Sequence, residues 1–166
     1  MVPFLENDVL RYFKEILVRF KNEEVVHDVC FVISNFFTNE FLLNMVVKAG
    51  LFEVLLAVRP STTEYVRIEI RWAVVNFINT AQPAHLTYAI QFDGFFQALA
   101  DFYVQNDQMS LFYVFSILKL CIYIDEMITL PEERDEVFVR LQQTGVVKCL
   151  ETFASCPNQK TRECAS

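Results

Sequence analysis

The stretch IRWAVVNF, residues 70–77, holds the only tryptophan of the chain, Trp72, four residues ahead of Asn76. Its apolar residues favour a buried helix, and four residues make about one helical turn, so the two side chains share one face. A related stretch, VCFVISNF (29–36), places Asn35 forty-one residues before Asn76. An asparagine near the end of an apolar helix therefore occurs twice at a fixed distance.

Composition favours helices throughout. The chain has 166 residues, of which 54% are hydrophobic, so it is long enough and apolar enough to bury a core. It contains only three glycines and five prolines, and a β-sandwich would need many more turn residues. We therefore expect an all-α protein with short connections.

The glycines reveal an internal repeat. Gly50, Gly94 and Gly145 are each followed by apolar residues at the same offsets, and Asp8 takes the place of the glycine in a first copy. A period of about forty residues is typical of armadillo and HEAT solenoids. The sequence predicts a single array over 1–166, with units at 1–37, 38–80 and 81–124 and a partial cap at 125–166.

Each full unit is expected to hold three helices, with a glycine turn before the second. The predicted first helices are Phe41–Lys48 and Leu86–Phe92, the second Leu51–Val58 and Phe95–Val104, and the third Glu64–Asn79 and Gln108–Ile124. Tyr113 and Ile117 lie in the predicted third helix Gln108–Ile124, forty-one residues beyond Trp72 and Asn76 respectively. The wider spacing between Gly94 and Gly145 predicts a surface loop in the polar stretch Asp125–Asp135.

Charge and hydropathy exclude several classes of function. The net charge of −7 argues against a nucleic-acid partner, because phosphate binding relies on clustered Lys and Arg. The longest apolar run, Met109–Ile124, contains Lys119 and is too short to cross a membrane. The N-terminal sequence has no secretory pattern. We expect a protein of the cytoplasm and nucleus, without membrane contact.

Nothing in the chain resembles catalytic machinery. The five cysteines form no CxxC pair, and neither His27 nor His85 belongs to a nucleophile or metal-ligand motif. The sequence therefore predicts no enzyme activity, no metal and no cofactor. His27 is expected on a helix surface, and the cysteines are expected in the core.

The repeated helices resemble a known family. Trp-x-x-x-Asn on the third helix of consecutive units resembles importin-α, the adaptor that binds nuclear localisation signals. The segments KNEEVVHDVCFVISNFFTN (21–39) and STTEYVRIEIRWAVVNFIN (61–79) resemble its seventh and eighth repeats. LFYVFSILKLC (111–121) and VFVRLQQTGVVKCLETF (137–153) resemble its ninth and tenth. The resemblance extends from about Val9 to Thr161.

This resemblance implies a right-handed armadillo solenoid whose third helices line a concave groove for extended basic peptides, as in the smaller, C-terminal signal pocket of the family. Aromatic walls would hold the stems of Lys and Arg by cation-π attraction, and asparagines would bond to the peptide backbone. An acid three residues before the tryptophan would meet a basic head. The predicted peptide-binding residues are Trp72, Asn76, Glu69, Phe31, Ser34 and Asn35.

Departures from the family pattern leave alternatives open. Phe31 replaces the tryptophan of the first copy, and Ile117 replaces the asparagine of the third, so the third helix should contribute little to peptide binding. Phe31 and Tyr113 fit equally well as core aromatics, and Asn76 fits as a brace to the adjacent unit. The alternative function is a protein-interaction scaffold that has lost signal binding.

Two kinds of protein partner are expected besides a basic peptide or cargo. A transport factor or another protein would bind the C-terminal units. Val9–Phe20 lacks a complete preceding unit, and an end repeat without a polar cap exposes apolar surface. We therefore also expect self-association through that end.

Overall fold

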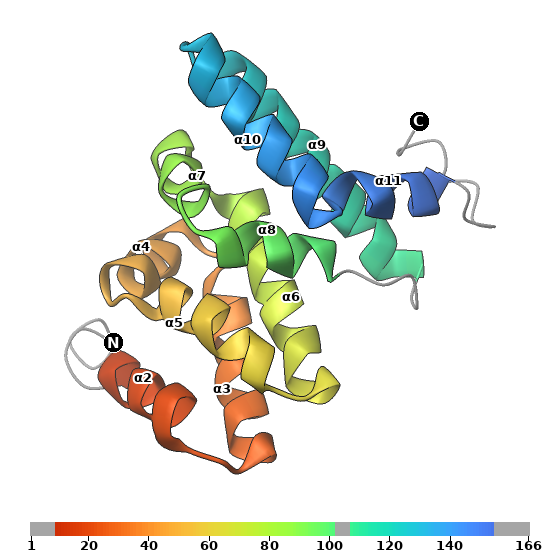
Figure 1. Cartoon of the computed structure of the whole chain (residues 1–166). Helices are drawn as coiled ribbons and strands as arrows, with labels where there is room; N and C mark the ends of the chain where they lie inside the picture. Colours follow the sequence, from red (N-terminus) through yellow and green to blue (C-terminus); the bar gives the residue numbers. More distant parts are fainter. Residues whose placement is uncertain (1–8, 102–106, 155–166) are drawn as a thin grey trace. The chain divides into compact units, whose positions relative to one another are not determined.

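The structure, a computed structural model, describes residues 9–101 and 107–154 (Figure 1). All regular secondary structure within these two ranges is helical. The chain divides into two compact units, Met1–Ala81 and Gln82–Ser166, which are called unit 1 and unit 2 below.

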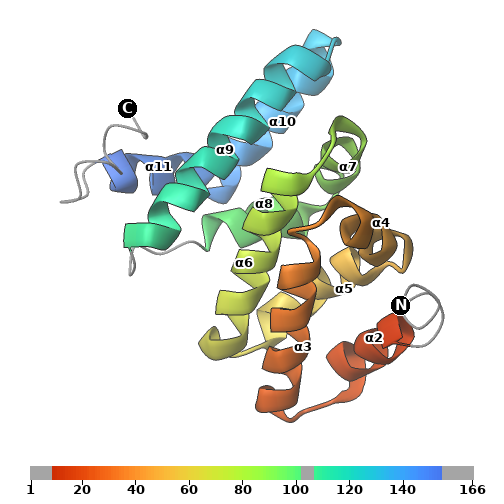
Figure 2. The same ribbon diagram turned by 180° about the vertical axis from the view of Figure 1, so that it is seen from behind.

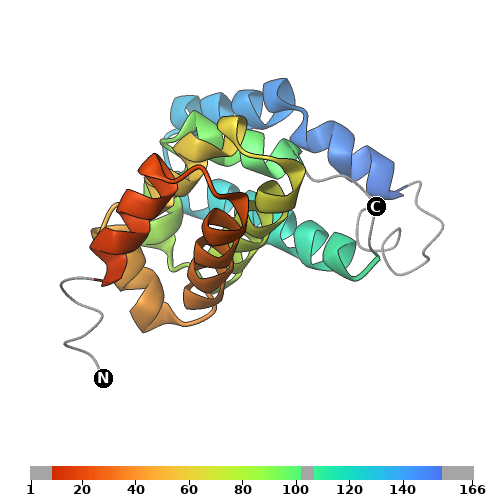
Figure 3. The ribbon, with the colours of Figure 1, turned by 90° about the horizontal axis from the view of Figure 1, so that it is seen from below.

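Unit 1 contains five α-helices and one short 3-10 helix in its described part. They are α2 (Leu10–Arg19), α3 (Glu23–Phe36), α4 (Glu40–Lys48), α5 (Leu51–Val58), η2 (Arg59–Ser61) and α6 (Glu64–Thr80). The chain changes direction between α2 and α3 (Figure 3). The long helices α3 and α6 lie side by side (Figure 2).

Asparagines start two of these helices. The side chain of Asn22 accepts hydrogen bonds from the backbone N–H groups of Glu24 and Val25, at 3.0 and 3.3 Å. Asn39 accepts one from Leu42 at 3.2 Å. A side-chain oxygen at this position satisfies N–H groups that the first helical turn leaves unpaired. The beginnings of α3 and α4 are therefore set by local sequence.

Three phenylalanines form the centre of unit 1. Phe37 lies edge-on to Phe52 and Phe77, with ring centroids 5.9 and 5.5 Å apart, and Phe52 stacks on Phe77 at 4.3 Å. All three are buried. Aromatic pairs in these arrangements contribute about 0.5–1.5 kcal/mol each beyond the burial of their surface. The cluster joins the end of α3 to α5 and α6.

Unit 2 contains α7 (Pro83–Ala89), α8 (Asp93–Ala100), α9 (Asp107–Met127), α10 (Pro131–Thr144) and α11 (Val146–Ala154). Arg140 ties α10 to the start of α8. Its guanidinium donates to the carbonyl oxygen of Ile90 at 2.7 Å and to the carboxylate of Asp93 at 2.8 Å, and it lies 4.6 Å from the ring centroid of Phe96. One cation therefore holds three groups of the α7–α8 region.

The predicted helices are found with shifted ends, and two of the three glycine turns are as expected. Gly50 and Gly145 have φ of 69° and 90°, the left-handed region that favours glycine, and they directly precede α5 and α11. The prediction for Gly94 is wrong, because α8 begins at Asp93, where an acidic residue stabilises a helix N-terminus. Residues 102–104 of the predicted second helix lie outside the described residues.

The predicted loop over Asp125–Asp135 is also wrong. Helix α9 continues to Met127 and α10 begins at Pro131, so only residues 128–130 connect them. Proline suits the first turn of a helix, and Glu132 and Glu133 complement the helix dipole there. The added residues of this repeat therefore lengthen two helices.

Within the described ranges, no single helix is long and apolar enough to cross a membrane. The bent pair of α4 with the segment Leu51–Ser61 passes that test only when the two are taken together.

Candidate functional site

The six predicted binding residues lie on two neighbouring helices of unit 1. Helix α3 carries Phe31, Ser34 and Asn35, and α6 carries Glu69, Trp72 and Asn76. The two sets are about forty residues apart in the sequence. The packing of α3 against α6 brings them close together in space. We call the surface formed by these six residues, together with the side chains next to them on the two helices, the α3–α6 face.

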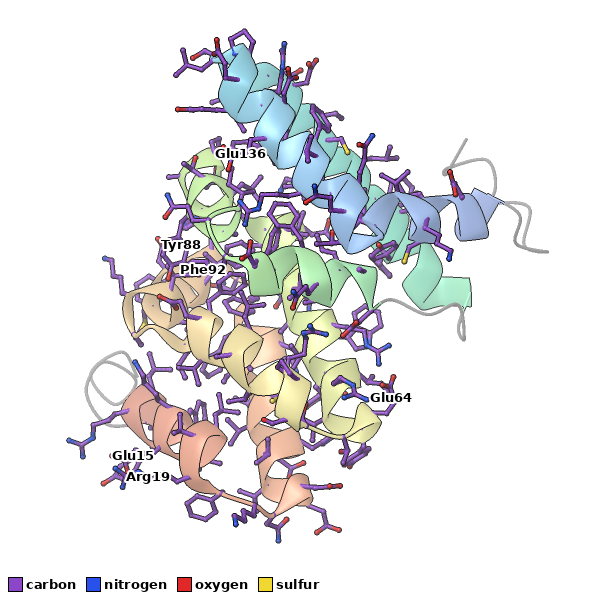
Figure 4. All side chains as sticks on the ribbon, viewed as in Figure 1. Glu15, Arg19, Glu64, Tyr88, Phe92 and Glu136 are labelled. Atoms are coloured by element: carbon purple, nitrogen blue, oxygen red, sulfur yellow. The ribbon has the colours of Figure 1, made fainter. Side chains whose placement is uncertain are left out.

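Ion pairs and a hydrogen bond link the first turns of helix α6. The carboxylate of Glu64 (Figure 4) pairs with Arg67, with Oε2 and Nε 3.1 Å apart, and with the buried guanidinium of Arg71. Arg67 also donates to the carbonyl oxygen of Thr62 at 2.8 Å. These contacts connect the loop before α6 to its first two turns.

Asn76 joins the two helices directly. Its amide nitrogen donates a hydrogen bond to the carbonyl oxygen of Ser34, at 3.0 Å. This is the bracing role that the sequence left open as an alternative for Asn76. The amide nitrogen is therefore used within the protein, and Asn76 Oδ1 is the atom with the chemistry to accept an N–H from a bound chain.

The two polar residues of α3 bond to their own helix. The Ser34 hydroxyl and the Asn35 amide nitrogen both donate to the carbonyl oxygen of Phe31, each at 2.8 Å. Ser34 is only 3% exposed, whereas Asn35 is exposed. Ser34 therefore meets α6 through its backbone carbonyl, and its hydroxyl faces inward.

Aromatic side chains are present at the surface of the α3–α6 face. Phe31 is 53% exposed and Tyr65, near the start of α6, is 51% exposed. Trp72 lies between α6 positions 69 and 76 and is half-buried. Phe31 is thus a surface aromatic residue of α3. The flat rings of Phe31, Tyr65 and Trp72 lie on the same two helices as the polar residues described above.

Glu69 has a partner inside the protein. Its Oε1 lies 3.6 Å from Nε2 of His27, and the side chains are 14% and 18% exposed. The His27 ring also stacks on Tyr65, with centroids 4.0 Å apart and planes 7° from parallel. His27, expected on a helix surface, is half-buried, because its imidazole packs against Tyr65 and approaches Glu69 of α6.

Burial shifts the ionisation of two groups here. Desolvation raises the pKa of Glu69 above its ordinary value, and the positive charge of His27 lowers it by a smaller amount. Burial, followed by the negative charge of Glu69, raises the pKa of the Cys30 thiol to about 12. Glu69 is therefore a carboxylate whose charge is poorly solvated, and a cation placed beside it would stabilise that charge.

His27 and Tyr65 were missed as members of this face. Each lies four residues before a predicted residue, since His27 precedes Phe31 and Tyr65 precedes Glu69. Residues one helical turn apart share a face. Both residues follow from the sequence when the set of predicted binding residues is extended by one turn towards the N-terminal end of each helix.

Helix α9 in unit 2 is the third helix of the next repeat. Its exposed positions differ from Tyr113 and Ile117, the two residues that the sequence aligned with Trp72 and Asn76. Tyr113 and Ile117 are buried, whereas its exposed large apolar residues include Phe112, Phe115, Leu118 and Ile122. Most positions that are buried in α6 between residues 70 and 77 are also buried in α9 when the two helices are offset by forty-three residues, close to the spacing of Gly50 and Gly94, although Val75 is buried and Leu118 is exposed. Phe115 and Lys119 thus correspond to Trp72 and Asn76.

Within the two described ranges, no group of three or more His, Cys, Asp and Glu side chains is arranged to hold a metal ion.

A search against protein-family models found no match. The chain is 24% identical over 139 residues to importin subunit alpha-1 of Caenorhabditis elegans. The match covers 82% of this chain but 26% of that protein, so the chain spans about a quarter of the length of its relative.

Two solved structures with a similar arrangement of helices are engineered proteins. A designed armadillo repeat protein in complex with the peptide (KR)4 aligns with a TM-score of 0.56 and 18% identity, over 94% of this chain and 78% of that one. An engineered protein solved by the Northeast Structural Genomics Consortium aligns with a TM-score of 0.63 and 18% identity, over 96% of this chain and 60% of that one. The predicted fold class is confirmed: the chain is an all-α protein with the armadillo-repeat solenoid fold.

Proposed function

We propose that this protein is a non-catalytic binding adaptor that holds short basic peptides, of the nuclear-localisation type, in an extended conformation on the α3–α6 face. The observation that carries the proposal is Glu69, a partly buried carboxylate with a raised pKa that approaches the His27 ring, which itself stacks on Tyr65. An aromatic wall beside a poorly solvated carboxylate is the chemistry that recognises Lys or Arg.

His27 supports this assignment from within the chain. Its ring stacks on Tyr65 while its Nε2 approaches Glu69, so it makes the two contacts that a bound basic side chain would make. A Lys or Arg of the ligand would displace the imidazole from Glu69 and lay its stem against Trp72. Asn76 Oδ1 would accept a backbone N–H of the extended peptide.

Charge and similarity point the same way. The chain carries a net charge of −7, which favours basic ligands. It resembles importin-α in sequence, and a designed armadillo protein of the same fold is known in complex with the peptide (KR)4. The proposed role in nuclear import implies residence in the cytoplasm and nucleus, with a basic protein as cargo.

The single tryptophan provides a direct test. Titrating (KR)4 into the protein should change the fluorescence of Trp72 and raise the anisotropy of a labelled peptide, whereas the matched acidic peptide (ED)4 should do neither. Trp72→Ala should weaken binding by about 0.5–2 kcal/mol, and Trp72→Phe by less. Unchanged affinity in Trp72→Ala, with folding intact by circular dichroism, would remove the α3–α6 face from the binding mechanism.

Charge can be separated from stacking by salt. Glu69→Gln should cost about 0.2–1 kcal/mol of affinity at low ionic strength, and this loss should shrink as salt is added. The loss caused by Trp72→Ala should persist, because stacking is not screened in the same way. Equal salt dependence of the two variants would contradict the assignment of roles.

The second candidate is a protein-interaction scaffold without peptide binding. It is favoured by the internal bonds of Ser34, Asn35 and Asn76, which already use groups that a peptide would need. The exposed apolar residues of α9 would then meet a protein partner, such as a transport factor at the C-terminal repeats. No binding of (KR)4, together with loss of a protein partner in Phe115→Asp, would favour this function.

A further inference from the structure

A cleft on unit 1 is lined by residues other than those of the α3–α6 face and combines apolar and basic side chains. It has a volume of about 650 Å³ and lies between α2 and α4. Leu10, Phe41 and Met45 line it, and Lys14 and Lys48 are among the basic residues at its edge. Clefts of about 300–1,000 Å³ commonly hold ligands or side chains of a partner.

The charge of this cleft differs from that of the whole chain. Of the described residues that line it, several are basic and none is acidic, although the chain has 21 acidic and 14 basic residues. Lys14 and Lys48 are both exposed, and Phe41 is 52% exposed. The cleft therefore fits an occupant that is apolar at its tip and acidic at its sides.

The turn between α9 and α10 in unit 2 has these properties. Its large side chains Met127 and Leu130 are 52% and 53% exposed. The exposed acids Glu126, Glu132 and Glu133 flank them. The nearby cation Arg134 is paired with Asp125, with Nη1 and Oδ1 3.4 Å apart, so the surrounding charge is acidic. Figure 1 shows this turn where α9 and α10 meet.

We propose that copies of this chain associate head to tail, with the α9–α10 turn of one copy seated in the α2–α4 cleft of the next. Met127 and Leu130 would bury their side chains against Phe41 and Met45. Glu132 and Glu133 would approach Lys14 and Lys48. Burial of apolar surface supplies the affinity, and the opposite charges set the orientation.

Such a contact uses two different surfaces, so each copy offers both a turn and a cleft to other copies. Head-to-tail association then gives larger species as the concentration rises, unless a ring forms. Each interface should weaken with added salt, because its ion pairs lie at the edge of the cleft and are screened. The proposal is independent of peptide binding, since the cleft and the α3–α6 face share no residue named above.

The test is a charge exchange between the two surfaces. One variant carries Lys14→Glu and Lys48→Glu, and a second carries Glu132→Lys and Glu133→Lys. Each alone places like charges on both surfaces, so sedimentation velocity should show self-association about tenfold weaker than in the unmodified chain. Mixing the two variants pairs opposite charges at every contact and should restore association.

A matched control has the same change in charge outside the cleft. Arg19→Glu with Lys21→Glu alters the exposed C-terminal end of α2, where Figure 4 labels Arg19, and should leave association unchanged. Circular dichroism confirms that each variant is folded. A chain that is monomeric at all concentrations overturns the proposal. Association that persists in both charge variants also overturns it and would assign the contact to another surface, such as the apolar residues of α9. A mixture of the two variants that fails to regain association overturns it as well.

Discussion

Asn76 of α6 caps the neighbouring helix α3 through its hydrogen bond to the carbonyl oxygen of Ser34. The carbonyl groups around Ser34, those of Ile33, Asn35 and Phe36, accept backbone N–H groups of residues 37, 38 and 39. The last carbonyls of a helix lack partners within the helix. An asparagine forty-two residues away satisfies one of them, which explains an amide side chain on an otherwise apolar helix.

Replacing Asn76 should therefore destabilise the fold as well as affect binding. Asn76→Ala leaves the Ser34 carbonyl without its side-chain donor, and we expect a loss of about 1–3 kcal/mol in the free energy of unfolding. Urea denaturation measures it. Asn35→Ala is the matched control, because the side-chain amide of the exposed Asn35 bonds to a carbonyl of its own helix, and it should change the free energy by less than about 0.5 kcal/mol. Equal losses in the two variants would show that the link between helices carries no stability.

His27 should compete with a basic ligand for Glu69. His27→Ala removes the imidazole from Tyr65 and Glu69, so the affinity for (KR)4 should rise by about 0.5 kcal/mol. Asp28→Asn provides the control, since the exposed Asp28 carboxylate approaches the other side of the same ring, with Oδ1 3.3 Å from Nδ1. It should leave affinity nearly unchanged. Weaker peptide binding in His27→Ala would mean that His27 is part of the wall.

Stability should depend on pH through Glu69. Because its folded pKa is raised, the protonated form is favoured by folding. The resulting stability is complete below the ordinary glutamate pKa of about 4.3 and is lost as the pH rises through the raised folded value. Glu69→Gln should therefore be more stable than the unmodified chain at neutral pH, and its advantage should vanish in acid. Denaturant titrations at several pH values test this, and an advantage that does not depend on pH would contradict it.

The glycine turns should tolerate alanine differently. Gly145 has φ of 90°, and no heavy atom of the described residues lies within 4 Å of an added Cβ, so Gly145→Ala isolates backbone strain and should cost about 1–2 kcal/mol. Gly50, at φ 69°, should cost a similar amount, because its nearest contact at 3.2 Å is the flexible end of Lys14. Gly94→Ala is the control without positive φ and should cost less. Thermal denaturation that ranks Gly94→Ala as the worst of the three would contradict the turn assignment.

Much of the fold was predictable from short spacings. The apolar pattern over residues 64–79 predicted α6 almost to its ends, and Gly50 and Gly145 predicted two turns, because helix phase and positive φ depend on residues within about one turn. The order of helices along the chain followed from the forty-residue period. The end of α9 and the start of α10 did not, because Asp125–Asp135 is polar and polarity alone does not separate a loop from an exposed helix.

The sequence by itself determined the helices, their repeat and the six residues proposed for the α3–α6 face. Only the tertiary structure decided what those residues do for one another. It placed His27 against Tyr65 and Glu69, and it made the Asn76 amide nitrogen a hydrogen-bond donor to the Ser34 carbonyl. It also buried Tyr113 and Ile117 and left Phe115 exposed. The reason is physical: helix formation is encoded by near neighbours, whereas the buried face of an apolar helix and the partners of its polar groups depend on segments about forty residues away.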